Sequence, residues 1–402
     1  MEIEKRSDRN SGVLDSEYED ALSLSAGDWV EIRTKDEILR TLDRTGQLDG
    51  LPFMPEMFAY CRRRFRVYKR AHKTCDTVND YKGRRMRATV HLEGLRCSGS
   101  SHGGCEAGCL IFWKHAWLKK VSPVDAEATA KPLEAEPEEG HQESPDSCRE
   151  EDVFAGTRRR GESGGNSPAY VCQATQVPAA TEPLSPWDLQ QYVEDYTSGN
   201  VRLGQILSGF IYMGYRHWLV NLGIGLGPTL RWLYDLFQKI RGGIPYPRRH
   251  GKIPLGERTP SLTLDLQPGE WVRVKSLPEI LATCDTEDNN RGMKWDAELV
   301  PYCGGTYRVL RRVTKIINER TGNMQTMKTP CIILDGVFCQ ARYSECRLFC
   351  PRSIYSYWRE IWLERVAERV CPSQAPTYQP SLVDAYSKAR AQDCASLASP
   401  QQ

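Results

Sequence analysis

The 402-residue sequence lacks several features that would point directly to a function. Its formal net charge is only +2, so it has no whole-chain attraction to nucleic acid or anionic lipid, and any such attraction must be local. A glycine-rich phosphate loop, a dinucleotide-binding fingerprint, a His-Glu-x-x-His motif and a nucleophile elbow are all missing, so no enzyme class is indicated. There is also no Cys-x-x-Cys pair, the usual signature of a zinc ribbon.

Long apolar runs are missing too. The longest charge-free stretches, 203–215 and 217–230, are shorter than the roughly 18 residues of a membrane-spanning helix. We therefore expect no transmembrane span, although the aromatic residues and flanking basic residues of 201–240 suit contact with a membrane surface. The first residues lack the basic-then-apolar pattern of a signal peptide, which favours a cytoplasmic, reducing compartment.

Cysteine, by contrast, is abundant. Eight of the fifteen cysteines form two quartets with the spacings C-x35-C-x7-C-x3-C and C-x35-C-x6-C-x3-C. The quartets are Cys61, Cys97, Cys105 and Cys109, and Cys303, Cys339, Cys346 and Cys350. In a reducing compartment, cysteines bind metals or do redox chemistry more often than they form structural disulfides.

The sequence around each quartet is itself repeated. Residues 27–70 and 269–312 align without a gap and share fifteen identities, including Trp29 with Trp271. The repeated unit of roughly 100 residues is long enough to fold alone, unlike the unit of a solenoid protein. The sequence therefore predicts an internal repeat of a small domain.

We expect an α+β protein with two homologous small-sheet modules, at 25–122 and 263–370. Alternating polar and apolar residues in 26–33 predict a strand, and its pattern Gly-x-Trp-Val-x-Ile/Val resembles the opening strand of a small SH3-like barrel. Thr34, with Glu37 three residues later, predicts a capped helix start.

Each module is also expected to end in a helix. Apolar residues in 105–121 recur with helical spacing. The last two cysteines of each quartet, four residues apart, would then lie on one face of this helix and point at one ion. The positive end of the helix would favour their thiolate forms.

The remaining segments are expected to flank or join the modules. Their composition predicts polar tails at 1–24 and 371–402, an acidic disordered linker at 123–185, an aromatic-rich helical segment at 186–245, and a Pro/Gly linker at 246–262.

The number of retained cysteines suggests a metal site in each module. Four thiolates complete a tetrahedral zinc site, and four also hold an iron–sulfur cluster. His72, Cys75 and His102 have no counterpart in the second repeat, whereas all four quartet positions do. We therefore predict two four-cysteine sites that bind structural zinc, with iron–sulfur clusters as the alternative. Buried apolar cysteines and one disulfide per module are further alternatives.

Carboxylates are also retained in both repeats, including Asp43 with Asp285. Glu56 corresponds to Glu298, and paired carboxylates can serve acid–base chemistry. No other catalytic group accompanies them, so we expect Glu56 to cap a short helix or to pair with Arg66.

A closed four-thiolate site without a catalytic motif favours a binding or scaffold protein whose partner is another protein. The alternative is an iron–sulfur redox or biosynthetic accessory enzyme. A third hypothesis is nucleic-acid binding by 62–87, where eleven lysine and arginine residues are interleaved with aromatic residues. Its candidate contacts are Arg62, Arg63, Arg64, Arg66, Lys69 and Arg70.

Overall fold

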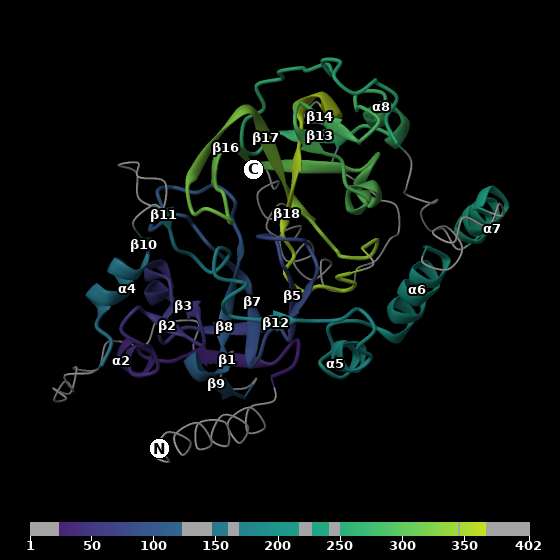
Figure 1. Ribbon diagram of the computed structural model, residues 1–402. Helices are drawn as coiled ribbons and strands as arrows, with labels where there is room; N and C mark the ends of the chain where they lie inside the picture. Colours follow the sequence, from purple (N-terminus) through teal and green to yellow (C-terminus); the bar gives the residue numbers. More distant parts are fainter. Residues whose placement is uncertain are drawn as a thin grey trace, which may run out of the picture. The chain divides into compact units, whose positions relative to one another are not determined.

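The structure is a computed structural model in which the chain forms two compact units (Figure 1). It describes residues 24–122, 147–159, 169–216, 227–240, 250–344 and 346–366. Unit 1 consists of Met1–Leu222, Val313–Lys328 and Cys339–Tyr355, and unit 2 of Gly223–Arg312, Thr329–Phe338 and Ser356–Gln402. The expected tails at 1–24 and 371–402 lie outside the described residues, except for Leu24.

Both units combine sheets with short helices, so the protein is of the α+β class, as expected. The strands of unit 1 are β1 (Trp29–Ile32), β2 (Gln47–Leu48), β3 (Leu51–Pro52), β4 (Arg64–Arg70), β5 (Lys73–Cys75), β6 (Gly83–Arg85), β7 (Thr89–Arg96), β8 (Leu110–Lys114), β9 (Leu118–Val121), β10 (Arg158–Arg159), β11 (Ala169–Tyr170) and β12 (Glu182–Pro183). Its helices and 3₁₀ turns are α2 (Lys35–Leu39), η1 (Pro55–Tyr60), η2 (His115–Trp117), α4 (Glu150–Gly156), α5 (Gln190–Thr197) and α6 (Leu203–Gly214).

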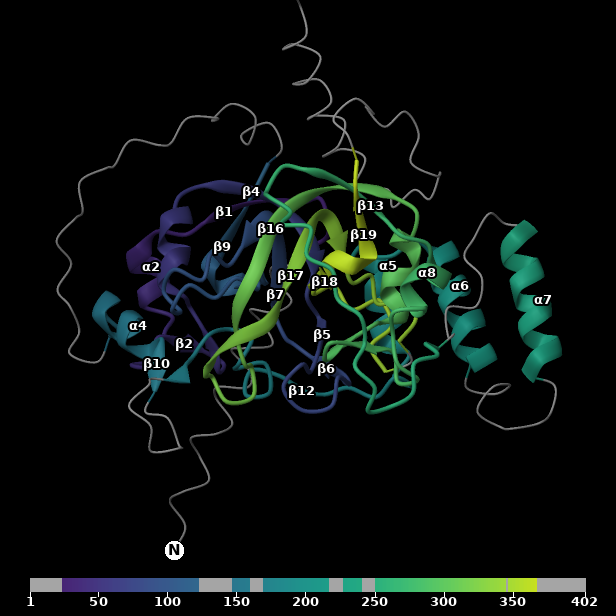
Figure 2. The same ribbon diagram turned by 90° about the horizontal axis from the view of Figure 1, so that it is seen from above.

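Unit 1 is built on an antiparallel five-stranded sheet with the order β8-β7-β4-β1-β9. Figure 2 labels β1, β4, β7 and β9 of this sheet. The strand predicted at 26–33 is confirmed as β1, in which Val30 and Ile32 are fully buried. The capped helix start is confirmed as well: the Thr34 side chain accepts a hydrogen bond from the Glu37 amide, and the Glu37 carboxylate accepts one from the Thr34 amide at 2.9 Å. Local sequence signals therefore predict this strand and this helix start correctly.

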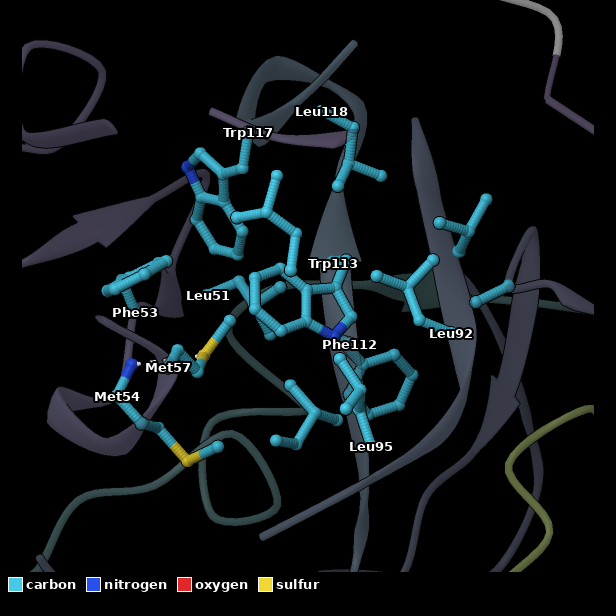
Figure 3. Packing of buried hydrophobic residues seen from close by; sticks show 14 of the residues in the cluster. Leu51, Phe53, Met54, Met57, Leu92, Leu95, Phe112, Trp113, Trp117 and Leu118 are labelled. Atoms are coloured by element: carbon cyan, nitrogen blue, oxygen red, sulfur yellow. Dashed lines mark hydrogen bonds between the residues drawn. The ribbon is translucent and has the colours of Figure 1, made fainter. Parts of the chain in front are cut away.

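The core of unit 1 lies beside this sheet and is rich in aromatic side chains (Figure 3). Trp113 and Trp117 are fully buried, and the Phe53 ring meets both edge-on, at centroid distances of 6.3 and 5.1 Å. The indole nitrogen of Trp117 donates to Thr41 Oγ1 at 3.0 Å, which satisfies its one polar atom. These contacts fix β8 and η2 in the core.

The prediction of a helix at 105–121 is wrong. The chain there forms β8, the turn η2 and β9. Every residue of β8 is buried, and a strand buried on both faces is a continuous apolar run that periodicity cannot distinguish from a helix. The helix expected in the second repeat is absent as well, since 355–365 also forms a strand, a 3₁₀ turn and a strand.

The disorder expected for 123–185 is wrong wherever the structure describes this segment. Residues 147–159 include α4, and the Gln173 side chain accepts a hydrogen bond from Phe112 N and donates one to Phe112 O, at 2.8 and 2.9 Å. Phe112 is in β8, an edge strand whose backbone groups need partners. One glutamine thus attaches the segment to the sheet. Residues 123–146 and 160–168 lie outside the described residues.

The aromatic-rich segment 186–245 is helical where it is described. It contains α5 and α6 in unit 1 and α7 (Gly227–Ile240) in unit 2. Ile206 and Met213 of α6 are buried in a cluster with Tyr192 and Phe349. None of the helices within the described ranges is both long and apolar enough to cross a membrane.

Unit 2 contains a five-stranded sheet with the order β18-β17-β16-β13-β19. Its strands are β13 (Trp271–Val274), β14 (Asn289–Asn290), β15 (Met293–Lys294), β16 (Thr306–Ile317), β17 (Met324–Phe338), β18 (Tyr355–Trp358) and β19 (Leu363–Arg365), and its short helices are α8 (Leu277–Leu281), η4 (Ala297–Tyr302) and η5 (Glu360–Trp362). The tip of the β16–β17 hairpin, 313–328, belongs to unit 1. The core of unit 2 is centred on Trp295, Trp358 and Trp362.

Candidate metal centre

A small cavity in unit 1 brings four thiols together. Its volume is about 30 Å³, enough for a water molecule or an ion. The side chains with chemistry in its wall are Cys97, Cys105, Cys109, Cys172, His102, Glu319 and Arg352. Three of these thiols belong to the first predicted quartet. The fourth member of that quartet, Cys61, is not among the residues that line the cavity, whereas Cys172 is.

The hairpin of β7 and β8 positions two of the thiols. Cys97 follows β7 directly, Cys109 precedes β8, and the Cys97 amide donates to the Cys109 carbonyl at 2.8 Å. The loop between them folds back tightly at Gly99, whose φ is +73° and where an added Cβ would lie 2.0 Å from the Cys105 carbonyl oxygen. Only glycine fits there, and this turn returns Cys105 to the cavity.

The tip of the β16–β17 hairpin holds Cys105 in place. Its Sγ accepts a hydrogen bond from the Ile317 amide at 3.4 Å. The carboxylate of Glu106 accepts hydrogen bonds from the amides of Thr314 at 2.5 Å and Lys315 at 3.1 Å. The position of Cys105 therefore depends on residues about 200 positions later in the chain.

Three possible ligand atoms converge beside the cavity, which Cys97 and His102 line but Glu56 does not. The metal-ligating atoms of Glu56, Cys97 and His102 all lie within 4.8 Å of one another. The Cys97 thiol donates to Glu56 Oε1 at 3.1 Å, and His102 Nδ1 lies 3.7 Å from the same oxygen. These spacings are near the edges of a tetrahedron around zinc, about 3.3–3.8 Å for bonds of 2.0–2.3 Å.

The imidazole of His102 is oriented for ligation. His102 is buried, and its Nε2 is 3.0 Å from the Val171 carbonyl, which can only accept, so Nε2 carries the proton. Nδ1 then lies on the side of Glu56 Oε1, 3.7 Å away, and is available to an ion whenever it carries no proton, the orientation that a second-shell carbonyl imposes on metal-bound histidines. Within the described ranges, His102 Nδ1 and Glu56 Oε2 are buried without a hydrogen-bond partner.

The Glu56 carboxylate favours a bound cation, whereas the protonated thiols oppose one. Burial alone would raise the pKa of Glu56, but His102 and the Cys97 thiol lower it to about 2, so Glu56 is a carboxylate. Burial raises the pKa of Cys97 well above its usual range, that of Cys109 to about 12 and that of Cys172 to about 11. No helix starts at Cys105, so the expected stabilisation of thiolates by a helix end is wrong. A metal ion would have to displace thiol protons, which makes its affinity fall as pH falls.

The second quartet is divided between the units. Cys303 belongs to unit 2, where it packs against the core and burial raises its pKa to about 12. Cys339, Cys346 and Cys350 belong to unit 1. There Cys339 and Cys350 lie in a cluster with Cys75, the cysteine without a counterpart in the second repeat. Hydrogen bonding from Cys350 lowers the pKa of Cys75 to about 6, against the effect of burial.

The basic stretch 62–87 makes many contacts within unit 1. At least six of its eleven basic residues form ion pairs: Arg64, Lys73, Lys82, Arg84, Arg85 and Arg87. Of the other predicted nucleic-acid contacts, Arg63 stacks on Phe65 and Lys69 on Tyr68, at 5.4 and 5.3 Å. Acidic partners within unit 1 therefore neutralise much of this charge.

Sequence reasoning missed Cys172 and set aside His102. The sequence carries one signal for Cys172, since it follows Ala169, Tyr170 and Val171 in an otherwise polar segment. His102 was discounted only because the second repeat has no counterpart. Comparison of the two repeats therefore leaves out any residue that occurs in one repeat alone.

Similarity gives no assignment for this cavity. No model of a known protein family matches the chain, and no curated protein shows significant sequence similarity to it. The function must therefore be inferred from the geometry and chemistry of the site.

Proposed function

We propose that the chain is a zinc-binding scaffold protein whose first site is formed by Cys97, His102, Glu56 and Cys105. The observation that carries this proposal is the convergence of three ligand atoms of different types within 4.8 Å. Sulfur, imidazole nitrogen and carboxylate oxygen are all zinc ligands. We assign Cys105 as the fourth donor because it lines the same cavity as Cys97 and His102, and its thiol would have to move closer, since the group within 4.8 Å does not include it.

The role we propose for the ion is structural. Four protein donors fill a tetrahedral sphere and leave no position for a reactive water. The ion would join η1, which carries Glu56, to the end of β7, which carries Cys97, and to the loop after it. Structural zinc ions of this kind are common in small domains whose hydrophobic cores are too small to stabilise the fold alone. The partner of the scaffold is, on this proposal, another protein.

We further propose that 25–122 and 263–370 are two copies of one module. The fifteen identities between 27–70 and 269–312 support this, and so does the matching order of the two five-stranded sheets. Trp29 lies opposite Arg66 in β4, and Trp271 lies opposite Arg308 in β16. In each sheet the first strand of the proposed module, β1 or β13, lies between the same two neighbours: β4 and β9 in unit 1, and β16 and β19 in unit 2.

Replacing His102 by alanine is expected to remove about one zinc ion per chain, because the ion loses one of four donors. Zinc is measured by mass spectrometry of the purified, desalted protein. His250→Ala is the matched control. His250 Nδ1 also faces a carboxylate, Asp288 Oδ2 at 2.8 Å, but its side chain is 67% exposed. The control is expected to keep all its zinc, and a His102→Ala protein that does the same contradicts the assignment.

Glu56→Gln separates loss of a ligand from loss of fold. The glutamine keeps the size of the side chain but removes the charge, so zinc should fall while the fluorescence of the buried tryptophans stays unchanged. If both zinc and fluorescence are unchanged, Glu56 is not a ligand.

The second candidate is an iron–sulfur cluster on Cys97, Cys105, Cys109 and Cys172. Two observations favour it. All four thiols line one cavity, and within the described residues their sulfur atoms do not all lie within 4.8 Å of one another. A single zinc ion would hold four sulfurs about 3.8 Å apart, whereas a cluster spreads them. Under this alternative, Cys109→Ser and Cys172→Ser lose iron and labile sulfide while His102→Ala keeps both.

A further inference from the structure

A second group of thiols lies in unit 1 at the end of β5. Cys75 and Cys350, only 4% and 5% exposed, are buried together with Ala341, and Cys339 packs against the same cluster. The two thiols are close enough for Cys350 to lower the pKa of Cys75. Three sulfur atoms from distant parts of the chain thus share one buried cluster.

Cys346 reaches the same place from the loop 339–354. Its carbonyl oxygen would lie 2.8 Å from a Cβ added at Gly83, so its backbone lies directly against β6. Gly83 is opposite Cys75 in the β5–β6 ladder. Cys346 is exposed, so its thiol can rotate toward the cluster or react with a reagent in solution.

Buried cations surround the cluster. Arg352 is 2% exposed, and its guanidinium donates to the Cys75 carbonyl at 3.0 Å. Lys73, also 2% exposed, interacts electrostatically with Cys350. Each cation also has a carboxylate neighbour, Glu319 at 3.5 Å for Arg352 and Asp195 at 2.5 Å for Lys73. Zinc bound by four thiolates, however, carries a net charge of about −2, and a buried charge of that sign requires nearby cations.

We propose that Cys75, Cys339, Cys346 and Cys350 form a second thiolate site that binds zinc. Because their sulfur atoms do not all lie within 4.8 Å of one another in the described structure, binding would have to draw them together. This second site depends on the proposed function only for the choice of zinc as the metal. It replaces Cys303, the fourth cysteine of the predicted quartet, by a residue from the first repeat. The two thiol groups of unit 1 then have the same composition. In the first, the last three cysteines of the first quartet are joined by Cys172, and in the second, the last three cysteines of the second quartet are joined by Cys75.

The test is the zinc content of matched serine variants of the full chain. Cys75→Ser is expected to lose about one of roughly two zinc ions, and Cys303→Ser to lose none. Both cysteines are partly or fully buried, so the control matches the volume and polarity of the change. If Cys303→Ser loses zinc and Cys75→Ser keeps it, the assignment is overturned.

Alkylation of Cys346 provides a readout that does not depend on stability. Because Cys346 is exposed, burial cannot protect it. Zinc-loaded wild type should react slowly with iodoacetamide at Cys346 and quickly after chelation, whereas Cys75→Ser should react quickly in both states. An equal rate with and without chelator, or a Cys75–Cys350 disulfide in the purified protein, overturns the proposal.

The two sites fail independently in these experiments. If His102→Ala keeps full zinc but Cys75→Ser loses one ion, the proposed first site is wrong and the second stands. If the variants behave in the opposite way, the second site is wrong and the proposed function stands. A Cys97→Ser/Cys75→Ser double variant should hold no zinc.

Discussion

Replacing Arg352 by alanine is expected to lower the free energy of unfolding by about 3–5 kcal/mol, the usual cost of removing one partner from a buried charged network. The guanidinium is 2% exposed and donates to the Cys75 carbonyl at 3.0 Å and to Thr77 Oγ1 at 2.7 Å. It also lies 3.5 Å from Glu319 Oε2. Its loss leaves these acceptors without a cation and opens the wall of the thiol cavity, which Arg352 also lines.

The measurement is urea denaturation followed by tryptophan fluorescence, with Arg87→Ala as control. Arg87 pairs with Glu182, and both side chains are 63% exposed. Exposed pairs contribute about 0–1 kcal/mol, so the control should unfold near the wild-type midpoint. Arg352→Lys should recover only part of the loss, because an ammonium cannot reproduce the planar set of donors. An Arg352→Ala protein as stable as Arg87→Ala would show that the buried network contributes little.

Replacing Asp195 by asparagine is the second change with a large expected effect, again about 3–5 kcal/mol. The Asp195 side chain is fully buried, and its Oδ2 accepts from Lys73 Nζ at 2.5 Å. Burial lowers the pKa of Lys73, which the Asp195 carboxylate opposes. Without the carboxylate, the buried ammonium keeps the uncharged acceptor Gln191 Oε1 at 3.2 Å and the Tyr192 ring, 4.8 Å from its centroid, but has lost its negative partner.

A compensating change tests this explanation. Lys73→Met/Asp195→Asn removes both charges and should recover much of the lost stability, since buried pairs are often replaceable by apolar residues. Glu182→Gln, which removes an exposed carboxylate, is expected to change stability by less than about 1 kcal/mol. If the double variant is less stable than Asp195→Asn, the unpaired ammonium is not the source of the loss.

The parts of the fold that depend on neighbouring residues could be predicted from the sequence. The strand at Trp29–Ile32 and the helix start at Thr34 follow from alternation and from a capping pair three residues apart. The structure of 105–121 could not be predicted correctly. All of β8 is buried, so it does not alternate between apolar and polar residues, and Trp113 and Trp117 in β8 and η2 are four residues apart, as on one face of a helix. Only the pairing of β8 with β7 decides between the two structures.

The candidate sites depend even more on distant contacts. Cys172 reaches the cavity because Gln173 satisfies the edge of β8, a tertiary contact that leaves no local pattern. Cys75 has no counterpart in the second repeat, yet it lies with Cys350, some 275 residues later in the chain. Repetition in the sequence identifies the triplet of cysteines in each copy, but it cannot identify a ligand contributed by a different segment.

The metal content of the full chain, purified without oxygen or chelator, tests the central claim most directly. We predict colourless protein with about two zinc ions per chain, one for each thiol group of unit 1. Brown protein with iron and labile sulfide would instead support the iron–sulfur alternative. Folded protein that contains neither zinc nor iron, with its cysteines present as free thiols, would contradict the claim that this chain is a metal-binding protein.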